Sequence, residues 1–208
     1  MKEKYSDITG IILSGGLSSR MGTDKALLKI GDQTIIERTR DLMSNIFENI
    51  LLSTNDFESY RFLGLPMVAD IYKDHGPISG VHAALVASVT NKNFFLSCDL
   101  PMMSKEMIRH IIEINSSKPI SIPIALGRTQ PLCGVYHKSL IPLIEKMVSD
   151  SIPSKKENGK STASIKQLIE KAGAEFIETK FLSFYNEDLF FNMNTADDFE
   201  ISKKKISK

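Results

Sequence analysis

The chain has few cysteines and no long apolar run. Its 208 residues include two cysteines, Cys98 and Cys133, which lie far apart and belong to no CxxC motif or Cys/His cluster. This pattern predicts neither a disulfide framework nor a zinc site, and it favours a reducing compartment. No apolar run approaches the ~20 residues of a membrane span, and the polar residues 1–7 are unlike a secretion signal. We therefore expect a cytoplasmic protein without membrane contact.

An excess of charge of either sign is also absent. The chain has 26 Lys and Arg residues against 25 Asp and Glu residues, so its formal net charge is +1 and its pI is about 7.7. Proteins that bind duplex nucleic acid usually carry a basic excess, because neutralised phosphates release counterions. The composition thus predicts no nucleic-acid partner. An interpretation as a nucleic-acid-binding protein depends only on the lysines of residues 203–208 and predicts salt-sensitive binding of nucleic acid.

Several common site motifs are missing. A P-loop needs the pattern GxxxxGK(S/T), whereas Gly16 and Gly22 have the wrong spacing and are followed by Thr23 and Asp24. The dinucleotide fingerprint GxGxxG and the zinc motif HExxH do not occur. The four histidines show no other ligand spacing, and no Ser/His/Asp arrangement is recognisable.

Apolar runs of strand length do alternate with segments of helical period. Strands are expected at residues 8–13, 49–54, 65–69, 93–98, 119–124 and 132–136, and helices at 34–47, 79–89, 138–148, 165–172 and after the N-cap Ser104. This order is typical of parallel strands joined by crossover helices.

The domain boundaries follow from the same pattern. No internal repeat or Gly/Ser/Pro-rich linker divides the chain, so one domain is expected over residues 8–201 after an N-terminal extension, 1–7. Residues 149–164 are predicted to form a mobile loop, and residues 202–208 a basic, disordered tail. Residues 175–177 and 181–185 are candidate edge strands.

The segment LSGGLSSRMGTDK, from Leu13 to Lys25, lies between the first strand and the first amphipathic helix. Gly15 and Gly16 allow successive backbone N–H groups to form a concave donor site for phosphate oxygens, and Arg20 and Lys25 add positive charge. Ligands of α/β folds bind at the carboxyl ends of strands. The segment therefore predicts a triphosphate site. The alternative is a glycine-rich turn whose basic side chains face solvent.

Two aspartates and a second glycine segment follow other strands. Asp99 can bind Mg²⁺ together with phosphate oxygens, or can instead cap a turn. Asp70 can accept hydrogen bonds from a guanine edge or a ribose hydroxyl, or can form a turn. The segment GPISG, which ends at Gly80, can form another backbone phosphate site, although Gly-Pro is also a loop signal. Weaker candidates are three side-chain amides: Asn192 and Asn194, before a short acidic helix, and Gln130, at the start of a strand. Thr195 is expected as an N-cap.

These segments occur in the order of a known family. The motifs are LSGGLSSRMGTDKALL from Leu13, VADIYKDHGPISGVHAAL from Val68, SCDLPMM from Ser97, QPLCGVY from Gln130 and FNMNTADD from Phe191. The chain resembles the molybdenum cofactor guanylyltransferase family, which attaches GMP to molybdopterin, over residues 8–198. The resemblance implies a single-domain, Rossmann-like nucleotidyltransferase of α/β class, a three-layer α/β/α fold with a mostly parallel mixed sheet.

The resemblance also implies roles for individual residues. GTP is contacted by Leu13, Ser14, Gly15, Gly16, Lys25, Asn55, Asp70, Gly80 and Asp99, and the pterin by Gln130, Pro131, Asn192 and Asn194. Arg20, Lys25 and Asp99 are catalytic in this assignment, and Asp99 holds Mg²⁺. Two features depart from the family pattern. Ser14 stands where alanine is usual, and the loop over residues 155–160 is longer and more polar.

The implied reaction needs no general base. The terminal phosphate of molybdopterin, a largely ionised monoester, attacks the α-phosphorus of GTP and expels pyrophosphate. The implied partners are GTP, molybdopterin, a molybdenum-insertion protein and molybdoenzyme chaperones. Alternatives are a cytidylyltransferase acting on the same pterin, a sugar-phosphate nucleotidyltransferase, and an inactive nucleotide-binding adaptor.

Overall fold

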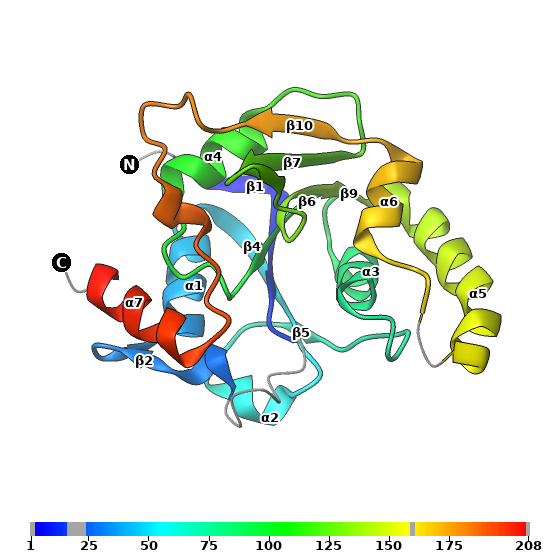
Figure 1. Cartoon of the computed structure of the whole chain (residues 1–208), viewed down its shortest axis with the longest axis horizontal. Coiled ribbons are helices and arrows are strands. Elements are labelled where there is room, and N and C mark those ends of the chain that lie inside the picture. The colour runs from blue at the N-terminus through cyan, green and yellow to red at the C-terminus, as the bar shows by residue number, and fades with distance from the viewer. Residues whose placement is uncertain (1–2, 16–23, 159–160, 207–208) are drawn as a thin grey trace.

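A mixed sheet of eight strands forms the middle layer of the protein (Figure 1). The computed structural model describes residues 3–15, 24–158 and 161–206. The strands are β1 (Tyr5–Leu13), β4 (Phe47–Ser53), β5 (Met67–Val68), β6 (Lys92–Ser97), β7 (Ile120–Ala125), β8 (Arg128–Thr129), β9 (Cys133–His137) and β10 (Glu175–Glu178). Their order is β10-β7-β9-β6-β1-β4-β5, with β8 paired to β7. β9 runs antiparallel to β6 and β7, whereas β1, β4, β5 and β6 run parallel to one another.

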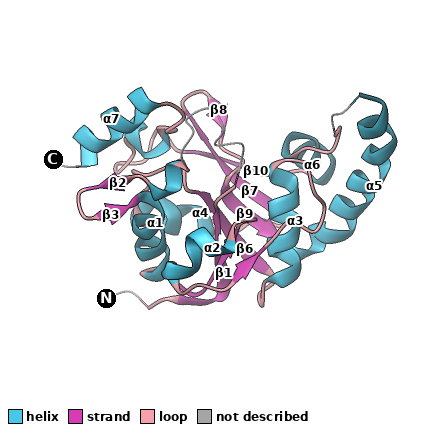
Figure 2. Ribbon diagram, turned by 90° about the horizontal axis from the view of Figure 1, so that it is seen from below, coloured by secondary structure: helices cyan, strands magenta, loops and turns pink. Residues whose placement is uncertain are grey.

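Helices cover both faces of this sheet (Figure 2). One face carries α1 (Ile35–Ser44), α4 (Lys105–Glu113) and the short η5 (Glu187–Phe190), and the other carries α3 (Pro77–Ala87), α5 (Ile141–Asn158) and α6 (Ile165–Ala172). The smaller elements are η2 (Lys25–Leu27), β2 (Lys29–Ile30), β3 (Gln33–Thr34), α2 (Phe57–Tyr60), η3 (Arg61–Leu63), η4 (Lys138–Leu140) and the C-terminal α7 (Ala196–Ile206). The expected three-layer fold with a mostly parallel sheet is confirmed. Among the described helices, none has the length and apolar character needed to cross a membrane.

Residues 8–13 of β1 are all buried because both faces of the strand are covered. Ile12 lies in one hydrophobic cluster with Met43 of α1, whereas Ile11 lies in the other cluster with Val81 of α3. All four side chains are fully buried. Consecutive residues of the strand therefore anchor the two helical layers to the sheet.

The register brings the ends of the parallel strands to one level. Leu13, the last residue of β1, pairs with Ser53 of β4 and with Ser97 of β6, and Ser53 also pairs with Val68 of β5. The chain switches sides at β1, because β4 and β6 flank it. Open α/β sheets bind ligands at such a switch point, outside the carboxyl ends of the strands. We call this side of the sheet the carboxyl edge.

Side-chain caps begin two helices, at Ser104, which the sequence predicts as an N-cap, and at Ser164, which it does not. The Ser104 Oγ accepts the N–H of Met107 (3.2 Å) at the start of α4, and the Ser164 Oγ accepts the N–H of Gln167 (3.2 Å) at the start of α6. Helix α6 ends at Gly173, whose φ of 76° suits a residue without Cβ.

Helix α5 corrects the loop expected at residues 149–164, since it continues to Asn158. Val148 is fully buried in the cluster formed with α3 and α6. The hydroxyl of Ser151, also buried, donates to the carbonyl of Val148 (2.7 Å). The same hydroxyl lies 3.3 Å from the His75 Nδ1, so a buried tertiary contact accompanies the helix in a segment whose polar composition is typical of a loop.

The expected edge strand at residues 181–185 is instead a series of turns. The N–H of Leu182 donates to the carbonyl of Thr179 (3.1 Å), and the N–H of Tyr185 donates to that of Leu182 (2.9 Å). These local bonds use the backbone groups that a strand would offer to a neighbour.

Both terminal boundaries differ from expectation. Strand β1 begins at Tyr5, whose N–H donates to the carbonyl of Ile46 (2.9 Å). Helix α7 continues to Ile206, which packs against Ile30 and Ile35, so residues 202–206 are helical rather than a disordered tail. Residues 207–208 lie outside the described residues.

Candidate nucleotide site

Polar residues follow each parallel strand at the carboxyl edge. Ser14 and Gly15 follow β1, Asn55 lies just after β4, Asp70 just after β5, and Asp99 just after β6. The structure thus places at one edge the side chains that the sequence positions at strand ends. Gly16 and Arg20, which belong to the same predicted site, lie outside the described residues.

Asn55 and Asp70 form a reciprocal pair. The Asn55 Nδ2 donates to the Asp70 Oδ2, and the Asp70 N–H donates to the Asn55 Oδ1, each at 2.9 Å. The pair joins the loops after β4 and β5, so the Asp70 carboxylate has a fixed orientation.

Helix α3 approaches this pair closely because residue 80 is glycine. A Cβ at Gly80 would lie 3.0 Å from the Ser53 Oγ and 3.6 Å from the Asp70 Oδ1. The Ser53 hydroxyl also donates to the Gly80 carbonyl (3.3 Å). The N-terminus of α3, which carries the positive end of the helix dipole, therefore lies beside the carboxyl edge.

Lys25 and Asp99 are linked through one stretch of backbone. The Lys25 Nζ donates to the carbonyl of Asn194 and lies 3.5 Å from that of Met193. The N–H of Met193 in turn donates to the carbonyl of Asp99 (2.9 Å). These bonds join Lys25 to the backbone of Asp99, and the charge of Lys25 also acts on the Asp99 carboxyl, so the two residues lie in the same part of the carboxyl edge.

Burial dominates the electrostatics of Asp99. The surrounding protein raises the pKa of the carboxyl, which a hydrogen bond from Ser97 and the charge of Lys25 partly offset. An ionised Asp99 at neutral pH therefore carries negative charge that its environment does not fully balance.

This environment fits a hard divalent cation. In the described part of the chain no three His, Cys, Asp or Glu side chains cluster as a complete metal site. Mg²⁺ commonly takes one or two protein carboxylates and completes its shell with water and substrate phosphates. One under-balanced carboxylate beside a lysine suits such a shared site better than a metal held by protein alone.

The residues expected at the pterin also reach this edge, but Gln130 has a structural partner. Its side chain is buried, and its Nε2 donates to the carbonyl of Ala125 (3.2 Å) in the β7–β8 hairpin. The carbonyl of Pro131 accepts the Tyr136 hydroxyl (2.6 Å). The Asn192 Nδ2 donates weakly to the carbonyl of Phe190 (3.4 Å).

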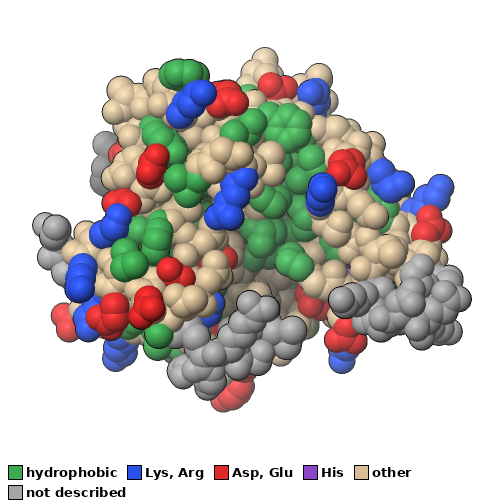
Figure 3. Space-filling view, viewed as in Figure 1, with side chains coloured by type: hydrophobic (Ala, Val, Ile, Leu, Met, Phe, Trp, Pro, Cys, Tyr) green, Lys and Arg blue, Asp and Glu red, His purple; other side chains and the backbone are tan. Residues whose placement is uncertain are grey.

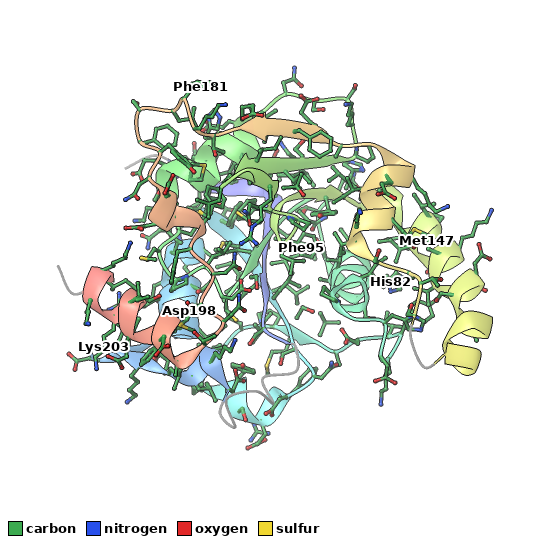
Figure 4. The ribbon with its side chains drawn as sticks, viewed as in Figure 1. His82, Phe95, Met147, Phe181, Asp198 and Lys203 are labelled. Carbon is green, nitrogen blue, oxygen red and sulfur yellow. The ribbon has the colours of Figure 1, made fainter. Side chains whose placement is uncertain are left out.

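Asp198 holds the backbone of the last site segment (Figure 4). Its Oδ2 accepts the N–H groups of Asn194 (2.9 Å) and Thr195 (2.8 Å), while the Thr195 Oγ1 accepts the N–H of Asp198 (3.1 Å). The expected capping role of Thr195 is thus present at the start of α7. These bonds, with a smaller effect of Lys25, lower the pKa of Asp198.

Tyr60 and Asp24 are neighbours of the site that the sequence does not single out. The Tyr60 hydroxyl accepts a hydrogen bond from the Ser14 Oγ (2.6 Å) and donates one to the Asp24 carboxylate. Tyr60 lies in a four-residue helix, which is too short to show a periodic pattern. No sequence signal connects it to its partners.

Comparison with known proteins identifies the family. Residues 10–171 match the family model described as MobA-like NTP transferase domain. A Pelotomaculum thermopropionicum protein named "Probable molybdenum cofactor guanylyltransferase" is 32% identical over 197 residues, covering 91% of this chain and 89% of its own. A Clostridium perfringens protein of the same name is 33% identical over 202 residues, covering 94% and 96%.

A solved structure agrees with the fold. It is titled molybdopterin-guanine dinucleotide biosynthesis protein A from Archaeoglobus fulgidus, has a TM-score of 0.74 at 21% identity, and covers 96% of this chain and 98% of that chain. At this identity the likeness concerns the fold. The family match and the two sequence relatives carry the assignment: the chain belongs to the MobA-like NTP transferase family.

Proposed function

We propose that the protein transfers GMP from GTP to the terminal phosphate of molybdenum-molybdopterin and releases pyrophosphate. The observation that carries this proposal is the link between Lys25 and Asp99 through residues 193–194. This link supports the proposal because it joins, at the switch point of an α/β sheet, a lysine that we propose binds phosphate to an aspartate that we propose binds Mg²⁺. The names of the sequence relatives support the choice of guanylyl transfer.

The donor nucleotide occupies the carboxyl edge in this proposal. The segment Leu13–Gly16 contacts the triphosphate, with the N–H groups of Gly15 and Gly16 as donors, and the cations Arg20 and Lys25 bind its phosphates. Asn55 and Asp70 bind the nucleoside, since their fixed side chains offer a carboxylate acceptor for guanine N–H groups or a ribose hydroxyl. The glycine at position 80 lets α3 approach Ser53 and Asp70 closely, so that the N-terminus of α3 lies beside the proposed nucleotide.

The chain contributes positioning and charge rather than a nucleophile. An oxygen of the acceptor phosphate bonds to the α-phosphorus of GTP, and the bond from that phosphorus to the pyrophosphate oxygen breaks. Lys25 and Arg20 offset charge on the phosphoryl oxygens. Asp99 would hold Mg²⁺, which would supply charge neutralisation of the phosphates. No side chain takes a proton, because the acceptor monoester is already largely ionised.

The acceptor binds next to this site, near Gln130, Pro131, Asn192 and Asn194. Figure 3 shows hydrophobic side chains gathered in a hollow at the centre of the face viewed in Figure 1, with basic side chains on both sides. A flat pterin and its phosphate fit apolar and basic surface of this kind. We also place the enzyme in the cytoplasm, in transient contact with a molybdenum-insertion protein and molybdoenzyme chaperones, with no nucleic-acid or membrane partner.

Pyrophosphate release from GTP, measured with and without molybdenum-loaded molybdopterin, tests the proposal. Guanylyl transfer requires release that depends on the acceptor and is faster with GTP than with CTP, UTP or ATP. Faster pyrophosphate release with CTP would identify a cytidylyltransferase. Pyrophosphate release with a sugar phosphate but not with molybdopterin would identify a sugar-phosphate nucleotidyltransferase. Nucleotide binding without release would identify an inactive adaptor.

A further inference from the structure

A buried hydroxyl links the two ends of the glycine-rich segment. Tyr60 closes α2, and 2% of its surface is exposed. Its hydroxyl accepts the Ser14 Oγ–H at 2.6 Å and donates to the Asp24 Oδ2. The Cys98 Sγ lies 3.9 Å from the same Ser14 Oγ. Segments far apart in sequence therefore meet at one oxygen atom.

Each partner of Tyr60 fixes a different part of the nucleotide site. The N–H of Ser14 donates to the carbonyl of Ser53 (3.0 Å), which extends the pairing of β1 with β4. The other Asp24 oxygen, Oδ1, accepts the N–H of Ala26 (3.0 Å) and caps η2, the turn that begins with Lys25. The contacts of Tyr60 thus run from the end of β1 to the turn that carries the cation.

The bond to Asp24 is the stronger of the two because its acceptor is charged. Burial raises the pKa of Tyr60, and the bond to Asp24 raises it further, so the hydroxyl keeps its proton and remains a donor. A charge-assisted bond from a rigid, buried ring holds Asp24 in place without the entropy cost of ordering a long surface side chain.

We infer that Tyr60 is a positioning residue for the nucleotide. Its hydroxyl holds Asp24 close to Ser14 and so fixes the distance between Lys25 and the end of β1. At this distance Lys25 and the end of β1 both contact the GTP phosphates. The inference rests on the proposed function for the identity of the nucleotide. Binding energy that would otherwise be spent in ordering this region is then available for affinity.

Tyr60→Phe tests the inference because it keeps the buried ring and removes the hydroxyl. Tyr5→Phe is the matched control, since Tyr5 lies at the opposite end of β1 and its hydroxyl bonds to Glu113. We expect Tyr60→Phe to raise the KM for GTP about 10-fold with kcat changed less than about twofold, as loss of preorganisation predicts. Partial unfolding would instead lower the apparent kcat and leave KM unchanged. A KM equal to that of Tyr5→Phe overturns the inference.

Hydrogen exchange of the free protein provides a readout independent of turnover. We expect faster exchange in Tyr60→Phe, but not in Tyr5→Phe, at the amides of Ser14 and Ala26, which lie next to the lost bonds. Unchanged exchange at both amides contradicts the inference even if GTP binds. If Tyr60→Phe exchanges faster than the wild-type protein at these amides but the wild-type protein binds no GTP, the proposed function is overturned and the structural role of Tyr60 stands.

Discussion

Asn55 and Asp70 bind each other through two hydrogen bonds of 2.9 Å, one between side chains and one from the Asp70 N–H to the Asn55 Oδ1. The pair spans two loops that leave neighbouring parallel strands. An asparagine here acts as both donor and acceptor, which neither aspartate nor alanine can do at neutral pH. The orientation of Asp70 beside α3 therefore depends on Asn55.

Asn55→Ala is expected to weaken GTP binding about 10-fold, because the Asp70 carboxylate loses a donor that fixes its orientation. Titration calorimetry with GTP and Mg²⁺ measures the change. Asn49→Ala is the control, since Asn49 lies on β4, the strand that precedes Asn55, and its amide donates at 3.3 Å to the carbonyl of Ser6, away from the carboxyl edge. Equal affinities of the two variants would exclude Asn55 from the nucleotide site.

Lys25→Ala is expected to lower guanylyl transfer on the order of 100-fold, as loss of one preorganised charge typically does. Pyrophosphate release at saturating GTP, Mg²⁺ and acceptor is the measurement. Lys29→Ala removes an exposed lysine of β2 and should retain wild-type turnover. Normal turnover in Lys25→Ala would refute the catalytic role of the cation.

Asp99→Asn is expected to lower transfer by a similar factor, on the order of 100-fold, and to raise the Mg²⁺ concentration needed for half-maximal rate. The amide keeps the size of the side chain and removes the charge that burial leaves under-balanced. A chelator should abolish turnover of the wild-type protein, and added Mg²⁺ should restore it. An unchanged Mg²⁺ dependence in Asp99→Asn would place the metal on other ligands.

The sequence predicts which residues lie at the carboxyl edge where they come shortly after an apolar strand. Asp99 and Asp70 are visible for that reason, because strand ends fix positions in an α/β fold before any tertiary contact is known. Tyr60 is not visible, since its partners Ser14 and Asp24 are 46 and 36 residues away in the chain. Only the packed structure determines which residues meet at its hydroxyl.

Helix boundaries show the same division between local and tertiary causes. Helix α6 is predicted correctly, and Gly173 is the local signal of its end. The extension of α5 to Asn158 and of α7 to Ile206 is not predicted, because Ser151 contacts His75 and Ile206 packs on the cluster of Ile30 and Ile35, and these partners are distant in the chain.

The β7–β8 hairpin contains a leucine in an unfavourable conformation. Its two-residue loop, Leu126-Gly127, has φ values of 53° and 70°, as in a type I′ turn, where Asn-Gly is preferred. Leu126→Asn should raise the free energy of unfolding by about 1 kcal/mol, because asparagine tolerates the left-handed region. Urea denaturation measures the gain. Leu126→Ala removes the same exposed side chain but keeps the positive φ, so an equal gain in that variant would contradict the explanation.

The cap of α7 should depend on pH through Asp198. Hydrogen bonds from the N–H groups of Asn194 and Thr195 lower the pKa of Asp198 in the folded protein. The ionised cap therefore stabilises the fold above the unfolded pKa of about 3.9, and this contribution is lost as the pH falls through the lower, folded pKa. Amide resonances of Asn194 and Thr195 should titrate with a midpoint below that value. Asp198→Asn keeps an oxygen acceptor but cannot ionise, so the titration should disappear. A midpoint at or above the ordinary pKa of aspartate would show that the two hydrogen bonds do not favour the carboxylate. The Asn194 carbonyl that accepts the Lys25 Nζ would then be held less rigidly than the structure shows.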